Sequence, residues 1–130
     1  MKRIIVLLCL MTGCLAGHGQ RPYRFERADR LFQEGKEFFE LRNYPGCSDK
    51  LTEFKTRSRD RDRVQEADYM LAIVAAEQGR EDAAAIMERY LATYPDTRHA
   101  NEIAFRLGSY YFAHEDYVTA LQWFNETDID

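Results

Sequence analysis

The feature of this 130-residue sequence that most restricts its fold is a threefold internal repeat. Three segments, residues 28–54, 65–91 and 101–127, align with one another without gaps. In each segment a small residue is followed, 12 positions later, by a second small residue. The first set is Gly35, Ala72 and Gly108, and the second set is Cys47, Ala84 and Ala120. A fixed period, here 37 and then 36 residues, is typical of proteins that stack copies of one small structural unit.

Each repeat is predicted to form two amphipathic helices. In the third repeat, large apolar residues such as Ile103, Leu107 and Tyr111 recur at helical spacing, and no repeat shows the sustained alternation of a strand. A polar turn divides each repeat into its two helices. These turns are predicted at Arg42-Asn43, Gln78-Gly79 and Glu115-Asp116. We expect the small residues to lie where two helices touch, because Gly or Ala lets helix axes approach to about 8 Å.

Two polar stretches connect the repeats. In Tyr94-Pro95-Asp96-Thr97, Pro95 cannot continue a helix, and Asp96 or Thr97 is expected to cap the helix that follows. In residues 57–63 the candidate caps are Ser58, Asp60 and Asp62.

The stretch of residues 57–63 also carries four arginines, Arg57, Arg59, Arg61 and Arg63. We interpret these arginines as part of a solvated connection or, alternatively, as a contact for a partner or an anionic lipid surface.

The third repeat resembles the pattern of the tetratricopeptide repeat (TPR) family. The match consists of Leu107-Gly108, Tyr111, Tyr117, Ala120 and Phe124. The first repeat follows the same pattern with Leu31, Gly35, Phe38, Tyr44, Cys47 and Leu51. In the second repeat Glu88 stands in the place of a large apolar residue, and we expect Met87 to replace it in the core. The resemblance covers about residues 25–127.

The resemblance implies an all-α fold, a right-handed α-solenoid of three TPR-like antiparallel helix pairs. The predicted solenoid domain spans residues 25–130, with repeats at about 28–56, 65–95 and 101–127. The stretch from Tyr90 to Thr97, together with residues 104–108 and Tyr111, is also similar to periplasmic and outer-membrane envelope TPR proteins of Gram-negative bacteria. These include lipoproteins of β-barrel assembly and coordinators of cell division.

Residues 1–19 have the layout of a secretory signal peptide. A basic start is followed by an unbroken apolar run, residues 4–11, which is too short to span a bilayer. Gly17 and Gly19 favour cleavage after Gly19, which leaves residues 20–24 as a linker before the domain. The alternatives are a lipobox that ends in a lipidated Cys14, or an uncleaved anchor. The predicted location is therefore periplasmic or secreted, or the outer membrane if Cys14 carries lipid.

The charge balance argues against a general nucleic-acid binder. The chain has 18 basic and 22 acidic residues, a net charge of -4, which becomes -6 when Lys2 and Arg3 leave with the leader. Cleavage after Gly19 also leaves Cys47 as the one cysteine, so that no intrachain disulfide can form. We expect Cys47 to be a small buried residue.

In the TPR family the front helix of each pair lines a concave groove, so the resemblance implies a binding surface. Carried over by position, it consists of Phe32, Lys36 and Phe39, of Tyr69, Ile73 and Ala76, and of Phe105, Ser109 and Phe112. Most of these side chains are large and apolar, which suits a bound amphipathic helix or extended peptide. Alternatively, several of them pack between repeats. Because the set has no Asn and Lys36 is its one cation, we do not expect recognition of a C-terminal carboxylate.

No catalytic or metal-binding motif stands out in the sequence. His99 and His114 lie in different elements, and we find no phosphate-binding loop, nucleophile elbow or Cys/His pair. We therefore expect no enzyme activity, no metal and no cofactor.

The leading hypothesis is a non-enzymatic protein–protein interaction scaffold of the bacterial cell envelope that binds a peptide or helix in the concave groove. A structural alternative concerns the third repeat, whose Leu121, Trp123 and Phe124 are not followed by a polar capping helix. Further repeats of a longer TPR protein, or a second copy in a homodimer, would then cover them. A third hypothesis is a glycan-binding or barrel-assembly lipoprotein. None involves nucleic acid, and a membrane is involved only if Cys14 is lipidated.

Overall fold

The computed structural model describes residues 23–127, and every regular element in this range is an α-helix. The helices are α1 (Tyr23–Glu40), α2 (Tyr44–Arg57), α3 (Arg61–Glu77), α4 (Ala83–Thr93), α5 (Ala100–Ala113) and α6 (Tyr117–Asn125). The all-α prediction is confirmed for this range. The predicted signal peptide, with Cys14, lies outside the described residues. Within residues 23–127, no helix has the length and apolar character needed to cross a membrane.

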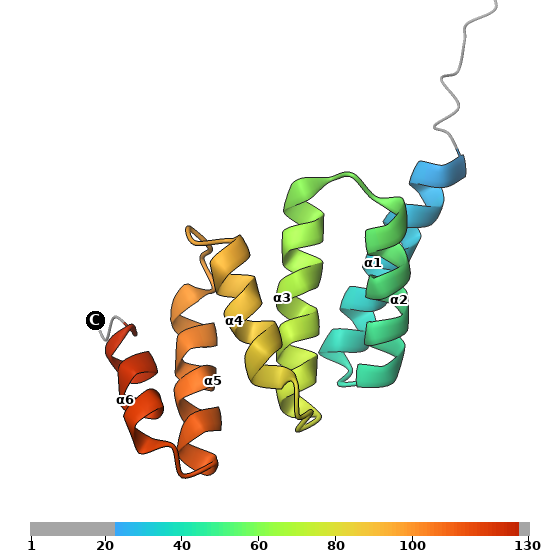
Figure 1. Cartoon of the computed structure of the whole chain (residues 1–130). Coiled ribbons are helices and arrows are strands. Elements are labelled where there is room, and N and C mark those ends of the chain that lie inside the picture. The colour runs from blue at the N-terminus through green and yellow to red at the C-terminus, as the bar shows by residue number, and fades with distance from the viewer. Residues whose placement is uncertain (1–22, 128–130) are drawn as a thin grey trace, which may run out of the picture.

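The helices follow one another in a row, with α1 and α2 at one end and α6 at the other (Figure 1). Each odd-numbered helix packs on the helix that follows it, most extensively α1 on α2 and α5 on α6. Contacts of α2 with α3 and of α4 with α5 join these hairpins, and α3 also touches α1 and α5. Among the described helices, the backbone of α6 approaches α5 alone. The position of α6 therefore depends on its contact with α5.

The three predicted turns are present and share one backbone geometry. Arg42, Gly79 and Glu115 are in the left-handed region, with φ of 55°, 62° and 63°. In each turn the next amide donates to a carbonyl five residues earlier. These bonds are Asn43 to Phe38 at 2.8 Å, Arg80 to Ala75 at 3.1 Å and Asp116 to Tyr111 at 3.0 Å. They close the C-termini of α1, α3 and α5 in the same way. The backbone thus repeats with the period of the sequence.

Replacing Glu115 with glycine is expected to stabilise the protein by up to about 1 kcal/mol. A side chain at φ of 63° has a steric cost that glycine does not have. Arg42→Gly should act in the same direction, whereas Gly79→Ala should destabilise by a similar amount. Thermal unfolding followed by circular dichroism measures all three changes. A lower melting temperature for both glycine variants would contradict the turn geometry.

Gly35 and Gly108 lie where the two helices of a hairpin touch, as predicted. A Cβ added at Gly35 would come within 2.7 Å of Leu51 Cγ, and one added at Gly108 would lie 2.5 Å from Phe124 Cε1. Leu51 and Phe124 each follow their glycine by 16 residues, so the first and third repeats make the same contact. Ala72, at the equivalent position of the second repeat, is fully buried.

The second set of small residues is also in the interior, and it includes Cys47. Ala84 and Ala120 are buried, and Cys47 is completely so. Burial raises the pKa of the Cys47 thiol to about 11. The thiol therefore stays protonated at neutral pH, and the prediction that Cys47 is a small buried residue is confirmed.

The core of the second repeat is filled by Met87, as the sequence predicts. Met87 is completely buried, in a cluster with Ile103 and Leu107. Glu88 instead accepts a hydrogen bond from the Tyr111 hydroxyl at 2.7 Å. This bond raises the pKa of Tyr111 to about 12. A position that is apolar in the other repeats has thus become a polar contact between α4 and α5.

Of the two predicted helix caps, the one before α3 is correct and the one before α5 differs in position. Asp60 caps α3, because its carboxylate accepts a hydrogen bond from the Arg63 amide at 3.2 Å. The N-cap of α5 is His99, which makes no side-chain cap bond, rather than Asp96 or Thr97. The Thr97 hydroxyl nevertheless accepts a hydrogen bond from the His99 amide at 3.3 Å, and it is also 2.7 Å from the Tyr90 hydroxyl in the interior. A buried tyrosine hydroxyl needs a polar partner, and Thr97 provides it.

Candidate protein-binding surface

Two of the predicted groove residues belong to the core. Phe32 is only 6% exposed, and its ring centroid lies 5.0 Å from that of Phe54. Ile73 is 4% exposed and packs in the cluster that contains Met87. The prediction that Phe32 and Ile73 are open to a partner is therefore wrong. Both side chains point into contacts between helices. Positions carried over from a family pattern do not distinguish such buried residues from exposed ones.

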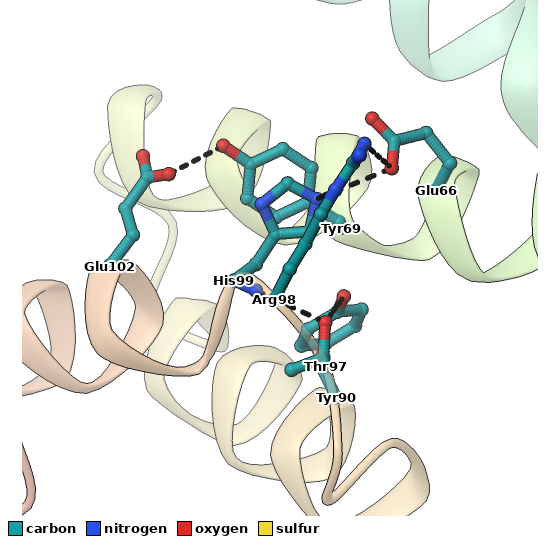
Figure 2. A network of polar contacts seen from close by, with 7 residues as sticks. All are labelled: Glu66, Tyr69, Tyr90, Thr97, Arg98, His99 and Glu102. Atoms are coloured by element: carbon teal, nitrogen blue, oxygen red, sulfur yellow. Dashed lines mark hydrogen bonds and ion pairs between the residues drawn. The ribbon is translucent and has the colours of Figure 1, made fainter.

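Tyr69 lies where α3 meets the connection between α4 and α5 (Figure 2). Its ring stacks on His99, with 3.6 Å between centroids and 8° between planes, and Phe39 lies beside it at 6.5 Å. The Tyr69 hydroxyl donates to Glu102 at 2.7 Å. Burial and then this bond to Glu102 raise the pKa of Tyr69 above its usual value. Tyr69 therefore acts as a neutral hydrogen-bond donor that joins α3 to α5.

Glu66, which also lies on α3, contacts the connection between α4 and α5 through Arg98 and His99 (Figure 2). Arg98 Nη2 lies 3.1 Å from Glu66 Oε2, and His99 Nε2 lies 3.2 Å from the same oxygen. No sequence motif relates α3 to residues 98 and 99, so this network is not predictable from the sequence. The network therefore links α3 to α5 and to the connection that precedes it.

A hollow lies beside this junction, between α3, α4 and α5. We name it the front hollow, and it is lined by Ala76, Glu77, Met87, Glu102, Phe105, Arg106, Ser109 and Tyr110. The Arg106 guanidinium lies 2.7 Å from Glu77 and 3.2 Å from Glu102. The Phe105 side chain is 57% exposed. The front hollow therefore combines an open aromatic ring with an ion-paired polar wall.

The structure gathers three of the predicted groove residues at the front hollow, namely Ala76, Phe105 and Ser109. Ser109 is not a free donor there, because its hydroxyl donates to the Phe105 carbonyl at 2.9 Å. Lys36 lies on α1, where its ammonium group is 5.9 Å from the centroid of the Phe32 ring. Phe112 is mainly exposed near the end of α5 and does not line the front hollow. The predicted surface is thus divided rather than continuous.

Apart from Leu41, the large apolar side chains that are mainly exposed in the described part of the chain all lie on α5 and α6. We name this set the α5–α6 apolar face, and it consists of Phe105, Phe112, Tyr117, Val118 and Leu121. Exposure of Leu121 was predicted and is confirmed. Trp123 and Phe124 are half-buried instead, because Trp123 packs on the core around Met87 and Phe124 covers Gly108.

Among the residues that the structure describes, no three His, Cys, Asp or Glu side chains gather as a group that could hold a metal ion. Comparisons with protein-family models, curated proteins and solved structures find no match for this chain. The function is therefore inferred from the front hollow and the α5–α6 apolar face.

Proposed function

We propose that this chain is a non-enzymatic protein-binding scaffold of the bacterial cell envelope, built as a right-handed TPR-type α-solenoid of three helix pairs. The equivalent left-handed turns at Arg42, Gly79 and Glu115 support three copies of one helix hairpin. The matching glycine contacts of the first and third repeats support the same arrangement. The basic and apolar residues at the start of the sequence support export from the cytoplasm.

The proposed partner is a protein segment, an amphipathic helix or an extended peptide, that binds at the front hollow. The observation that carries this proposal is the exposed ring of Phe105 beside the ion-paired side chains of Glu77 and Arg106. Covering apolar surface contributes about 25 cal/mol for each Å² removed from water. The outer atoms of Glu77 and Arg106 would bond to polar groups of the partner. An aromatic anchor with a polar rim is typical of protein interfaces.

Phe105→Ala is expected to weaken binding of this partner by at least about tenfold, because truncating an aromatic anchor costs about 2 kcal/mol or more. The partner would be captured from an envelope extract on the immobilised protein, identified and then titrated against the wild type and the variant. Leu41→Ala is the matched control, because Leu41 is another exposed apolar residue but lies in the first hairpin turn. Equal affinities of the wild type and a folded Phe105→Ala protein would contradict the front-hollow proposal.

The proposed export rests on the leader and has its own measurement. Mass spectrometry of the chain from its natural host would identify the mature N-terminus. A start at Gln20 is expected for a soluble exported protein, and a lipid-bearing Cys14 for an outer-membrane lipoprotein. A chain that keeps residues 1–19 and is found in the cytoplasm would contradict an envelope location.

A second candidate function is self-association through the α5–α6 apolar face. The observation in favour is that five large apolar side chains on these two helices are mainly exposed, with the rings of Phe112 and Tyr117 in contact. Light scattering would then show a dimer that Leu121→Glu converts to a monomer, whereas Leu41→Glu leaves it intact. A monomer at every concentration tested would exclude this candidate without affecting the front hollow.

A further inference from the structure

A second concave surface lies on the other side of α3 from the front hollow. We name it the back groove. It runs between α2, α3 and α4, and its polar lining includes Thr52, Lys55, Asp68, Arg80, Arg89 and Thr93. Asp68 faces the back groove, whereas Glu77 faces the front hollow. These two residues are nine positions apart, which on an α-helix places them about half a turn apart around the axis. A ligand in the back groove would therefore leave the front hollow free.

The charges in the back groove do not cancel. Lys55 forms an ion pair with Asp68, and the same carboxylate accepts a hydrogen bond from the Tyr94 hydroxyl at 2.8 Å. Arg80 is paired with Asp82 at 2.6 Å. Arg89 has no ion pair with any residue that the structure describes. The back groove therefore presents the Arg89 guanidinium, which has no contact ion pair and lies within electrostatic reach of Asp82, beside two ion-paired cations.

A second hollow adjoins the back groove and continues its positive charge. It is lined by Arg59, Arg61, Val64 and Tyr94, and Tyr94 also lines the back groove. Four arginines lie at or near the connection between α2 and α3. Of these, Arg57 pairs with Glu53, and Arg63 pairs with Asp29 and Asp60. Arg59 and Arg61 are exposed and take part in no ion pair among the described residues.

The acidic side chains nearest to these arginines in the chain have other roles. The Asp60 carboxylate accepts the Arg63 amide as the cap of α3. Asp62 lies in the first turn of α3, where a negative charge interacts favourably with the helix dipole. The hydroxyl of Tyr94 remains a donor at neutral pH, because burial and the bond to Asp68 raise the pKa of Tyr94 to about 12. The Tyr94 proton is already given to Asp68, so this face offers guanidinium donors beside the Tyr94 ring and an apolar contact at Val64.

We propose that the back groove and the adjoining arginine hollow form a second binding site, which takes an acidic segment of a partner protein. One carboxylate of the segment binds at Arg89, with the Thr52 hydroxyl on the same lining, whereas the Thr93 hydroxyl already donates to the Arg89 carbonyl at 2.7 Å. Further carboxylates bind Arg59 and Arg61, and an apolar side chain packs on Val64 and Tyr94. Guanidinium–carboxylate hydrogen bonds are charge-assisted. They are stronger still when two N–H groups of the guanidinium bond to the two oxygens of one carboxylate.

A peptide fits this surface better than a lipid bilayer or a nucleic acid does. Arg89 lies in a concave groove between helices, into which an extended chain can enter but a flat membrane surface cannot. A nucleic acid would meet a chain whose net charge is -4, and which therefore repels a long polyanion beyond the short arginine stretch. A short acidic segment needs only the local positive charge.

The test uses the purified protein and a fluorescein-labelled heptapeptide with one phenylalanine between two runs of three glutamates. Fluorescence anisotropy should show saturable binding that Arg89→Glu and the double variant Arg59→Glu/Arg61→Glu each weaken by about tenfold or more. Arg42→Glu is the matched control, because Arg42 is exposed and forms no ion pair within residues 23–127 but lies in the first hairpin turn. It should change the affinity by less than twofold. Arg89→Gln, which removes the charge without reversing it, should give an intermediate loss.

Three outcomes would overturn the proposal. These are no binding of the acidic peptide, equal weakening by Arg42→Glu and Arg89→Glu, and binding to phosphatidylglycerol vesicles without binding to the peptide. Phe105→Ala should leave the peptide affinity unchanged, so that failure at the back groove and failure at the front hollow are separable.

Discussion

Gly108→Val is expected to lower the free energy of unfolding by about 2–3 kcal/mol, although a side chain in place of glycine normally favours a helix. A Cβ at this position would lie 2.5 Å from Phe124 Cε1, which is closer than carbon atoms can approach without displacement. The backbone of α6 is held by α5, so the clash would push α6 outward. Trp123, the single tryptophan of the chain, lies on α6 and reports this movement by a red shift of its fluorescence.

Ser109→Val provides the control for this effect. Ser109 is the next residue along α5 and is exposed, so the same side chain there meets no packed neighbour. Urea unfolding, followed by circular dichroism and by tryptophan fluorescence, gives the two free energies. If Gly108→Val were as stable as Ser109→Val, α5 and α6 would not touch at Gly108.

Met87→Ala is expected to cost about 3 kcal/mol of stability, within the range of about 2–5 kcal/mol for such truncations in a core. Met87 is completely buried in the cluster with Ile103 and Leu107, so its truncation leaves a cavity in the core. Glu88→Ala should cost about 1 kcal/mol, because it removes the hydrogen bond from Tyr111 and no core volume. A greater loss for Glu88→Ala than for Met87→Ala would mean that α4 is rotated from its described orientation.

The parts of the fold that follow from local physics could be predicted from the sequence. The positions of Gly35 and Gly108 in the repeat indicate where helices touch, and the polar pairs indicate the turns. The left-handed geometry of these turns is visible in the sequence only at Gly79. Arg42 and Glu115 adopt the same φ without being glycine, and their geometry becomes evident only when the three turns are compared.

The candidate site depends on contacts between repeats and was predicted less well. The family pattern places Phe32, Ile73 and Phe105 on equivalent faces, yet only Phe105 is open. The difference arises because the first two are covered by neighbouring helices, whereas Phe105 lies on the last hairpin. The network of Glu66 and His99 joins residues 33 positions apart, and no local pattern relates them.

The central claim is that the two helices of a repeat meet at a glycine opposite a large apolar side chain. Nuclear Overhauser effects in a solution spectrum test this directly. We expect cross-peaks between the Gly108 Hα protons and the ring protons of Phe124, and between the Gly35 Hα protons and the methyl groups of Leu51. Assigned spectra that lack both sets, and in which Phe124 and Leu51 show contacts to other residues instead, would contradict the described packing.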